Sequence, residues 1–130
     1  MTEFVTDTQA LFWYLTESPH LGEKAAKAFD DAENGKALIY VSAMVLAELF
    51  YVNERNMKPI HFAQSYTALS EIANIVFCDV TPKDILEFEK DVGISEMHDR
   101  IVVGLARRTG ATLITNNEAI VASNIVPTAW

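Results

Sequence analysis

Hydrophobic residues along the chain fall into short continuous runs that alternate with stretches of helical spacing. Four runs, at residues 4–6, 37–41, 75–78 and 112–115, have the length of strands. A continuous apolar run of this length is typical of a strand that is covered on both faces of a sheet. A shorter run at residues 125–126 predicts a fifth strand at the edge of that sheet.

The stretches between these runs have the patterns of helices. Ser42 is a suitable N-cap for a helix that contains Glu48, and residues 81–84 combine a threonine N-cap with a proline at the first helical position. Further helices are predicted at residues 11–15, 21–34, 59–74 and 99–110. This alternation predicts an α/β fold in which helices cover both faces of a mostly parallel sheet of four or five strands.

Length and composition describe an ordinary globular chain. The 130 residues, half of them hydrophobic and 22% charged, contain no repeat or linker, so we expect one domain spanning residues 1–130. The start lacks the basic and apolar segments of a signal peptide, and no apolar stretch reaches the roughly 18 residues that a membrane span needs. The single cysteine, Cys78, excludes an internal disulfide. We therefore expect a cytoplasmic protein that does not enter a membrane.

The net charge of −8 at pH 7 argues against a module that binds nucleic acid through a basic surface. The acidic balance is compatible with a nucleic-acid substrate if several carboxylates hold divalent cations, because a bound cation inverts the local potential. Two such ions would bring the formal charge from −8 to −4. A metal-dependent nuclease therefore stays open, whereas a general DNA-binding module is disfavoured.

Glu48 is the most informative single residue. It is the only charged residue in the apolar segment 45–52, so few orientations of this helix leave its carboxylate well solvated. Burying an unpaired carboxylate is costly, and proteins usually compensate by pairing, protonation or metal binding. Metal binding is one interpretation. The other is a glutamate that reaches solvent or pairs with Arg55, two turns further on.

Asp7 and Asp99 are two further candidates, each placed where a helix is expected to begin. Aspartate is a favoured N-cap, so either residue alone is explained as a cap. Asp7 and residues 115–117 also follow strands, and ligand sites of parallel sheets lie beyond the carboxyl ends of the strands. Together with Glu48, the two aspartates form a candidate site for a hard cation. Ligand sets made only of oxygen suit Mg²⁺ or Mn²⁺ and not Zn²⁺.

Other enzymes built on a similar sheet fit the sequence poorly. A haloacid-dehalogenase-like phosphatase needs a second aspartate two residues after the first, where this chain has Gln9. A response-regulator receiver needs a lysine after its later strand, and no lysine follows Lys90. The five glycines are scattered and form no phosphate-binding loop, so we expect no nucleotide cofactor.

Four segments of the chain resemble, in order, the motifs of PIN-domain ribonucleases. They are residues 5–11, 45–49, 98–106 and 111–118. The resemblance is greatest to the VapC-type toxins of bacterial and archaeal toxin–antitoxin pairs, and it extends over the whole chain. It implies a PIN-like α/β/α sandwich and an endoribonuclease that depends on one or two Mg²⁺ or Mn²⁺ ions. It also implies an RNA substrate, a homodimer and inhibition by a cognate antitoxin.

The resemblance assigns roles to individual residues as well. Asp7, Glu48 and Asp99 match the family's first three acidic positions, and we expect them to be catalytic metal ligands. The fourth acidic position holds Asn117, whose amide oxygen can coordinate a metal but carries no charge. The alternative for Asn117 is a simple turn or helix cap.

Three neighbouring residues are candidates for a supporting or substitute role. Thr115 matches the hydroxyl residue that precedes the fourth acidic position by two places, and Glu96 and Glu118 could replace the missing carboxylate. The neutral fourth position and the acidic balance keep other functions open. A catalytically weak PIN-like module could bind RNA or a protein partner, and a stand-alone RNA-processing nuclease could act without an antitoxin. The large apolar groups at residues 12–14 and 50–51 are compatible with either a wide core or a partner surface.

Overall fold

Five parallel strands form the central sheet of the computed structural model, which describes residues 1–130. The elements in chain order are β1 (Thr2–Thr6), α1 (Thr8–Leu15), α2 (Glu23–Glu33), β2 (Ala37–Ser42), α3 (Ala43–Arg55), α4 (Phe62–Ser70), β3 (Ile75–Cys78), α5 (Pro82–Leu86), the 3₁₀ helix η1 (Glu87–Lys90), α6 (Met97–Thr109), β4 (Thr112–Ile114), α7 (Glu118–Ser123) and β5 (Thr128–Ala129). The predicted α/β class is therefore confirmed.

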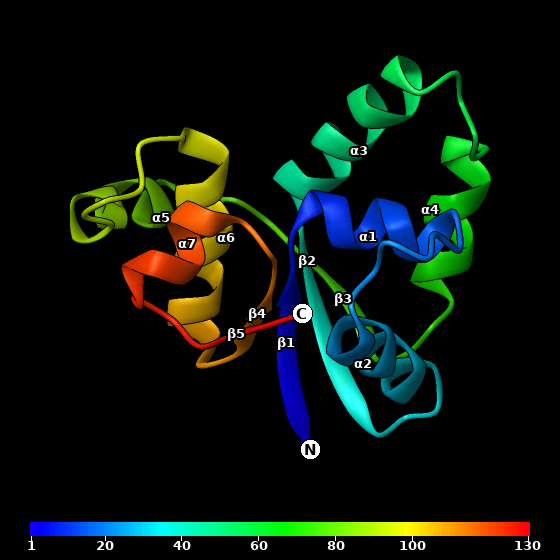
Figure 1. The fold of residues 1–130 in the computed structure, drawn as a ribbon, viewed down its shortest axis with the longest axis horizontal. Coiled ribbons are helices and arrows are strands. Elements are labelled where there is room, and N and C mark those ends of the chain that lie inside the picture. Colours follow the sequence, from blue (N-terminus) through cyan, green and yellow to red (C-terminus); the bar gives the residue numbers. More distant parts are fainter.

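The order of the strands explains where a site can form. The sheet has the order β3-β2-β1-β4-β5, so the chain runs outward from β1 to β3 and then returns to build β4 and β5 on the other side of β1. Helices α1 to α4 lie on one side of the sheet and α5 to α7 on the other (Figure 1). The direction of winding therefore reverses between β1 and β4. In open parallel sheets the crevice at such a reversal, at the carboxyl ends of the strands, is the usual ligand site.

Apolar side chains from both layers of helices are buried against this sheet. Val5, Ile39 and Leu113 of the strands are fully buried, as are Leu11 of α1 and Phe29 of α2. They belong to one core cluster of 24 buried residues. Removal of apolar surface from water on both faces is the main force that holds the strand ends in register.

The predicted fifth strand is misplaced. Residues 125–126 do not pair with the sheet, and the strand β5 follows Pro127 instead. The backbone amides of Leu113 and Thr115 donate to the carbonyls of Pro127 and Ala129, at 2.9 and 3.1 Å. Proline has no amide to give to a ladder but can accept through its carbonyl at a strand start. Val126 is 7% exposed and serves the core, which accounts for its apolar character.

Two predicted helices have different ends in the structure. The helix predicted at residues 59–74 is confined to α4, because the Asn53 side chain holds the backbone of Ile60 in a loop through two hydrogen bonds of 3.0 and 3.2 Å. The helix predicted to open at Asp99 begins two residues earlier, at Met97. No helix is both long and apolar enough to span a bilayer.

Arginines tie the segment between β3 and α6 to the rest of the molecule. Arg100 donates to the carbonyls of Ile94 and Phe88, at 2.6 and 3.0 Å. Arg107 pairs with Asp91, a side chain that is only 1% exposed. One carboxylate oxygen of Asp91 has no hydrogen-bond partner, so the ion pair with Arg107 is the main interaction that compensates the buried charge of Asp91. These side chains therefore have structural roles on α6.

Candidate metal centre

Asp7 lies at the point where β1 ends and α1 begins. Its carboxylate accepts a hydrogen bond from the amide of Ala10 at 2.8 Å, so it caps α1. The Asp7 amide donates to the carbonyl of Ile114 at 3.1 Å, which fixes the residue against the end of β4. The nearby hydroxyl of Thr115 stabilises the ionised form of this carboxylate. The N-cap interpretation is confirmed, and the cap lies at the edge of the sheet where a ligand site is expected.

Glu48 reaches the same edge from the middle of α3. Its Oε1 accepts a hydrogen bond of 2.6 Å from the hydroxyl of Thr8, the first residue of α1. Its Oε2 lies 3.8 Å from Nδ1 of His98, and the side chain is 33% exposed. Pairing with Arg55 is therefore wrong. The carboxylate keeps its solvation by facing a cavity.

Asp99 lies in the first turn of α6 and is not its N-cap. Glu96 holds that position and accepts a hydrogen bond from the Asp99 amide at 2.9 Å. The Asp99 carboxylate is thereby free of a capping role. Its Oδ2 accepts a contact of 3.4 Å from the side-chain amide of Asn117. The interpretation of Asp99 as a helix cap is therefore wrong.

These three carboxylates line one cavity of about 210 Å³. The complete lining consists of Asp7, Thr8, Gln9, Glu48, His98, Asp99, Val102, Asn116 and Asn117. No lysine or arginine is among these residues, so His98 is the only side chain there that can carry a positive charge. The start of α1 with its N-cap Asp7, helices α3 and α6, and the loop after β4 all contribute, although they are far apart in the sequence.

Burial, with a smaller contribution from neighbouring negative charge, raises the pKa of both aspartates. Burial raises the pKa of Asp7 from 3.8 to about 6; hydrogen bonds from Thr115 and Ala10 oppose the shift, and repulsion from Asp99 and Glu48 adds to it. Burial also raises the pKa of Asp99, and repulsion from Glu96 and Glu48 contributes. A positive charge in the cavity would relieve both the desolvation and the repulsion.

The donor set fits a hard divalent cation in chemistry but is not closed around one point. No group of three or more His, Cys, Asp or Glu side chains stands close enough together to enclose a metal ion. The carboxylates instead face a shared cavity from three elements. The atoms with which its aspartate, glutamate and asparagine side chains can bind a metal are all oxygens. Mg²⁺ and Mn²⁺ accept such ligands and retain several waters, so they do not need a closed protein cage.

Asn117 caps α7. Its side-chain oxygen accepts a hydrogen bond from the amide of Ile120 at 3.1 Å, and its side-chain nitrogen points to Asp99. The oxygen with which it could ligate a metal is therefore engaged, although a carbonyl oxygen has a second lone pair. Thr115 is 1% exposed and also accepts from the Asn117 amide at 3.1 Å. Thr115 therefore interacts with both Asp7 and Asn117.

The two glutamates proposed as substitutes for a fourth carboxylate do not line the cavity. Glu118 lines a neighbouring one, and Glu96 caps α6 and contacts His98. The hydrogen bond that His98 donates to Glu96 raises the pKa of His98, and the nearby carboxylates raise it further.

Thr8 is a site residue that sequence reasoning missed. It directly follows Asp7, but its partner Glu48 is on another helix, and no linear pattern reveals that contact.

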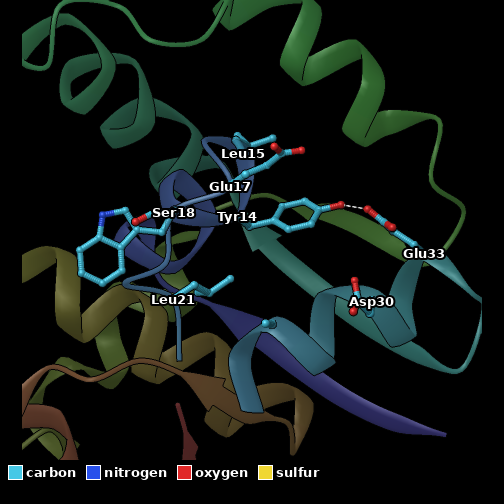
Figure 2. A pocket seen from close by; sticks show the side chains of 9 residues that line it. Tyr14, Leu15, Glu17, Ser18, Leu21, Asp30 and Glu33 are labelled. Atoms are coloured by element: carbon cyan, nitrogen blue, oxygen red, sulfur yellow. Dashed lines mark hydrogen bonds between the residues drawn. The ribbon is translucent and has the colours of Figure 1, made fainter. Parts of the chain in front are cut away.

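A larger cavity of about 530 Å³ lies away from these carboxylates, between α1 and α2. Figure 2 shows Tyr14 reaching across it to Glu33, with Glu17 and Asp30 at its rim. The Tyr14 ring stacks on Phe29 with centroids 4.2 Å apart. This cavity between α1 and α2 shares no lining residue with the candidate metal centre.

The sequence model of the PIN domain matches residues 4–123. The chain belongs to the PIN-domain family. The match begins in β1 and ends with α7, so it includes every element that contributes to the cavity. Among curated protein sequences, none matches the chain significantly.

Solved structures of similar fold include two VapBC complexes and a VapC toxin. VapBC2 of Rickettsia felis, bound to a DNA fragment from the promoter, matches with a TM-score of 0.69 and 18% identity over 98% of both chains. DNA-bound VapBC of Salmonella typhimurium matches with 0.67 and 16% over 99% of this PIN domain and 98% of that chain. VapC20 of Mycobacterium tuberculosis, a toxin that cleaves the sarcin–ricin loop, matches with 0.65 and 15% over 92% and 94%. At these identities the likeness establishes a shared fold.

Proposed function

We propose that this PIN domain is a Mg²⁺- or Mn²⁺-dependent endoribonuclease, the toxin of a toxin–antitoxin pair. One observation carries the proposal: Asp7, Glu48 and Asp99, from three separate elements, line one cavity that no lysine or arginine neutralises. Similarity to VapBC structures and to a toxin that cleaves the sarcin–ricin loop supports it.

Each side chain has a distinct part in this proposal. Asp7, Glu48 and Asp99 are the metal ligands, Thr115 orients Asp7, and Asn117 is an uncharged fourth ligand. When bound, the ion supplies positive charge that polarises the phosphodiester and makes nearby water more acidic. The carboxylates hold that charge at the carboxyl ends of β1 and β4, and no side-chain nucleophile is required. Because Asn117 is neutral and its oxygen caps α7, we propose that one ion is bound more tightly than a second.

The assembly and location follow from the same proposal. A toxin of this kind would form a homodimer, meet its RNA substrate in the cytoplasm and be inhibited by a cognate antitoxin. The VapBC structures of similar fold support an antitoxin partner. The match to the PIN domain over residues 4–123 supports a single domain across the chain.

Cleavage of purified RNA tests the activity. We expect fragments of total RNA with Mg²⁺ or Mn²⁺ and none with EDTA. Asp7→Asn and Asp99→Asn should abolish the fragments, while Asp30→Asn, an exposed carboxylate on α2, should cut like the wild type. An intact RNA at every metal concentration would contradict the enzyme.

The contacts of Asn117 favour one second candidate function. A side-chain amide that caps α7 and donates to Asp99 lowers the charge of the site without adding a ligand. This is the arrangement expected of a module that holds RNA or a partner and cuts slowly or not at all. RNA that binds stably but stays intact in the same assay would support this function.

A further inference from the structure

A different cavity from the one between α1 and α2, here called the side cavity, adjoins the candidate metal centre. It encloses about 450 Å³ next to the ends of β4 and β5. Asn116 lines both cavities, so they meet in the loop after β4. The three other sizeable cavities share no residue with the metal centre. The side cavity is therefore the only one of these that a ligand at the metal centre could enter directly.

The volumes of the metal centre and the side cavity indicate which part of a substrate each can hold. Pockets that hold small organic ligands usually enclose roughly 300–1,000 Å³. The metal centre, at about 210 Å³, has room for a phosphate group with its ions but is too small for a nucleoside as well. The side cavity, at about 450 Å³, lies within the range for small organic ligands. A nucleoside attached to a phosphate at the metal centre would therefore need this second space.

Charge distinguishes the side cavity from the metal centre. Lys24, in the first turn of α2, is the only lysine or arginine that lines either cavity. It is exposed and forms no ion pair, whereas Lys27, one turn further along α2, pairs with Asp31 at 2.6 Å. Glu118 also lines the side cavity, at the start of α7. In a chain of net charge −8, this free ammonium is a positive charge that attracts a phosphate lying in the side cavity.

An aromatic ring held in a fixed position forms another part of the lining. Trp130 is partly exposed and lines the side cavity, and its indole packs edge-on against Trp13, with ring centroids 5.7 Å apart. It also closes over Gly22, where a Cβ atom would come within 2.5 Å of the ring. An anchored indole presents a π-face without losing side-chain entropy on binding. Stacking of a base on such a ring tolerates any base.

We propose that the side cavity binds the nucleotide next to the scissile phosphodiester of a single-stranded RNA. The base lies against the indole of Trp130, and a phosphate lies at the ammonium of Lys24. Asn116 contacts the RNA chain where it passes between the two cavities. This inference rests on the proposed ribonuclease function, because it takes the phosphodiester to lie at the metal centre.

Binding of a fluorescein-labelled ten-nucleotide single-stranded RNA tests the subsite without cleavage. All variants carry Asp7→Asn and are measured by anisotropy in Mg²⁺ at several salt concentrations. Lys24→Ala should weaken binding and reduce the slope of log K against log salt by about 0.7, the value for one phosphate contact on a single strand. Lys27→Ala is the matched control on the same helix and should change neither quantity.

A pair of apolar substitutions tests the stacking contact. Trp130→Phe and Trp130→Leu both keep an apolar side chain over Gly22, but only phenylalanine keeps a π-face. Leucine should weaken binding by about 5- to 150-fold, the range for the loss of one stacked base, and phenylalanine by much less. Thermal melting verifies that both variants fold.

Two results would overturn the subsite while leaving the nuclease intact. They are equal salt slopes for Lys24→Ala and Lys27→Ala, and equal affinities for the phenylalanine and leucine variants. Cleavage of RNA by the wild type is scored separately, so failure of the subsite is distinguishable from failure of the enzyme. No RNA binding by any variant, together with no cleavage, would overturn both.

Discussion

Single carboxylates at the metal centre work against the stability of the fold that presents them. Burial in the folded chain raises the pKa of Asp7 from its ordinary value of 3.8 to about 6. As the pH rises between these two values, the unfolded chain releases its proton first, so the folded state loses stability relative to it. Below the lower value both states are protonated and the effect disappears. The cost at neutral pH amounts to as much as ~3 kcal/mol.

Asp7→Asn should therefore stabilise the metal-free protein at neutral pH. Asparagine keeps the N-cap of α1 and removes the charge. Urea denaturation in EDTA should show a gain of about 2–3 kcal/mol near pH 7.5 and almost none near pH 4. Asp30→Asn, an exposed residue of α2, is the control and should change little at either pH. An equal gain at both pH values would mean that the charge of Asp7 is not the cause.

Thr8 is expected to hold Glu48 in position for the metal. Thr8→Val removes the hydroxyl that donates to Glu48 at 2.6 Å, and Thr8→Ser keeps it. We expect valine to weaken Mn²⁺ binding by about tenfold, as loss of a partner that orients a ligand usually does, and serine to restore it. Calorimetric titration of Mn²⁺ measures both variants. Equal affinities for valine and serine would exclude this positioning role.

Asn117→Asp should convert the neutral fourth position into a carboxylate. Aspartate can still cap α7, while its second oxygen faces Asp99 in place of the amide nitrogen. Mn²⁺ affinity should rise by roughly tenfold, which is ~1.4 kcal/mol. Without metal the added repulsion should lower the melting temperature. A rise in stability in EDTA would contradict this assignment of the charges.

Among the secondary-structure elements, α6 depends on a buried ion pair. Asp91 is 1% exposed, and Arg107 is its partner. Arg107→Ala leaves the Asp91 charge uncompensated and should destabilise the fold by roughly 3–5 kcal/mol. Lys90→Ala breaks an exposed pair and should change the stability far less. Chemical denaturation measures both, and combining Arg107→Ala with Asp91→Asn should recover part of the loss.

Elements with an uninterrupted local pattern were predictable from the sequence, and those decided by distant contacts were not. The strands at residues 37–41 and 75–78 and the N-cap at Thr81 depend on neighbouring residues, and the structure confirms them. The start of α4 is set by the side chain of Asn53, and β5 by pairing with β4 beyond Pro127. These contacts join separate elements, so no periodicity in the segment itself could reveal them.

The candidate site shows the same division. Asp7, Glu48 and Asp99 could be selected from their positions relative to predicted strands and helices, and their cavity is consistent with that choice. The cap of α6 by Glu96 and the contact of Thr8 with Glu48 required coordinates. Asn117 could be read as a ligand or as a cap, and the structure adds its hydrogen bonds to Ile120 and Asp99.

For the whole molecule, metal binding should be measurable as folding stability. A ligand that binds only the folded state stabilises it by about 2.7 kcal/mol at 100 times its dissociation constant. Mn²⁺ should therefore raise the melting temperature of the wild type by several degrees, and EDTA should reverse the shift. Asp99→Asn should show little or no shift. The same increase in that variant would indicate binding away from the three carboxylates.

The pairing of β1 with β4 also determines when the site can form during synthesis. Phe4 of β1 pairs with Thr112 of β4, so this pairing cannot form until nearly the whole chain has been synthesised. Contacts between such distant segments form slowly, because a long loop must close before any of them is gained. A nascent chain that ends before β4 carries all three acids but cannot bring Asp7 to the end of β4. Ribosome-bound or truncated fragments of this protein should therefore lack the metal site, although every proposed carboxylate ligand has already been translated.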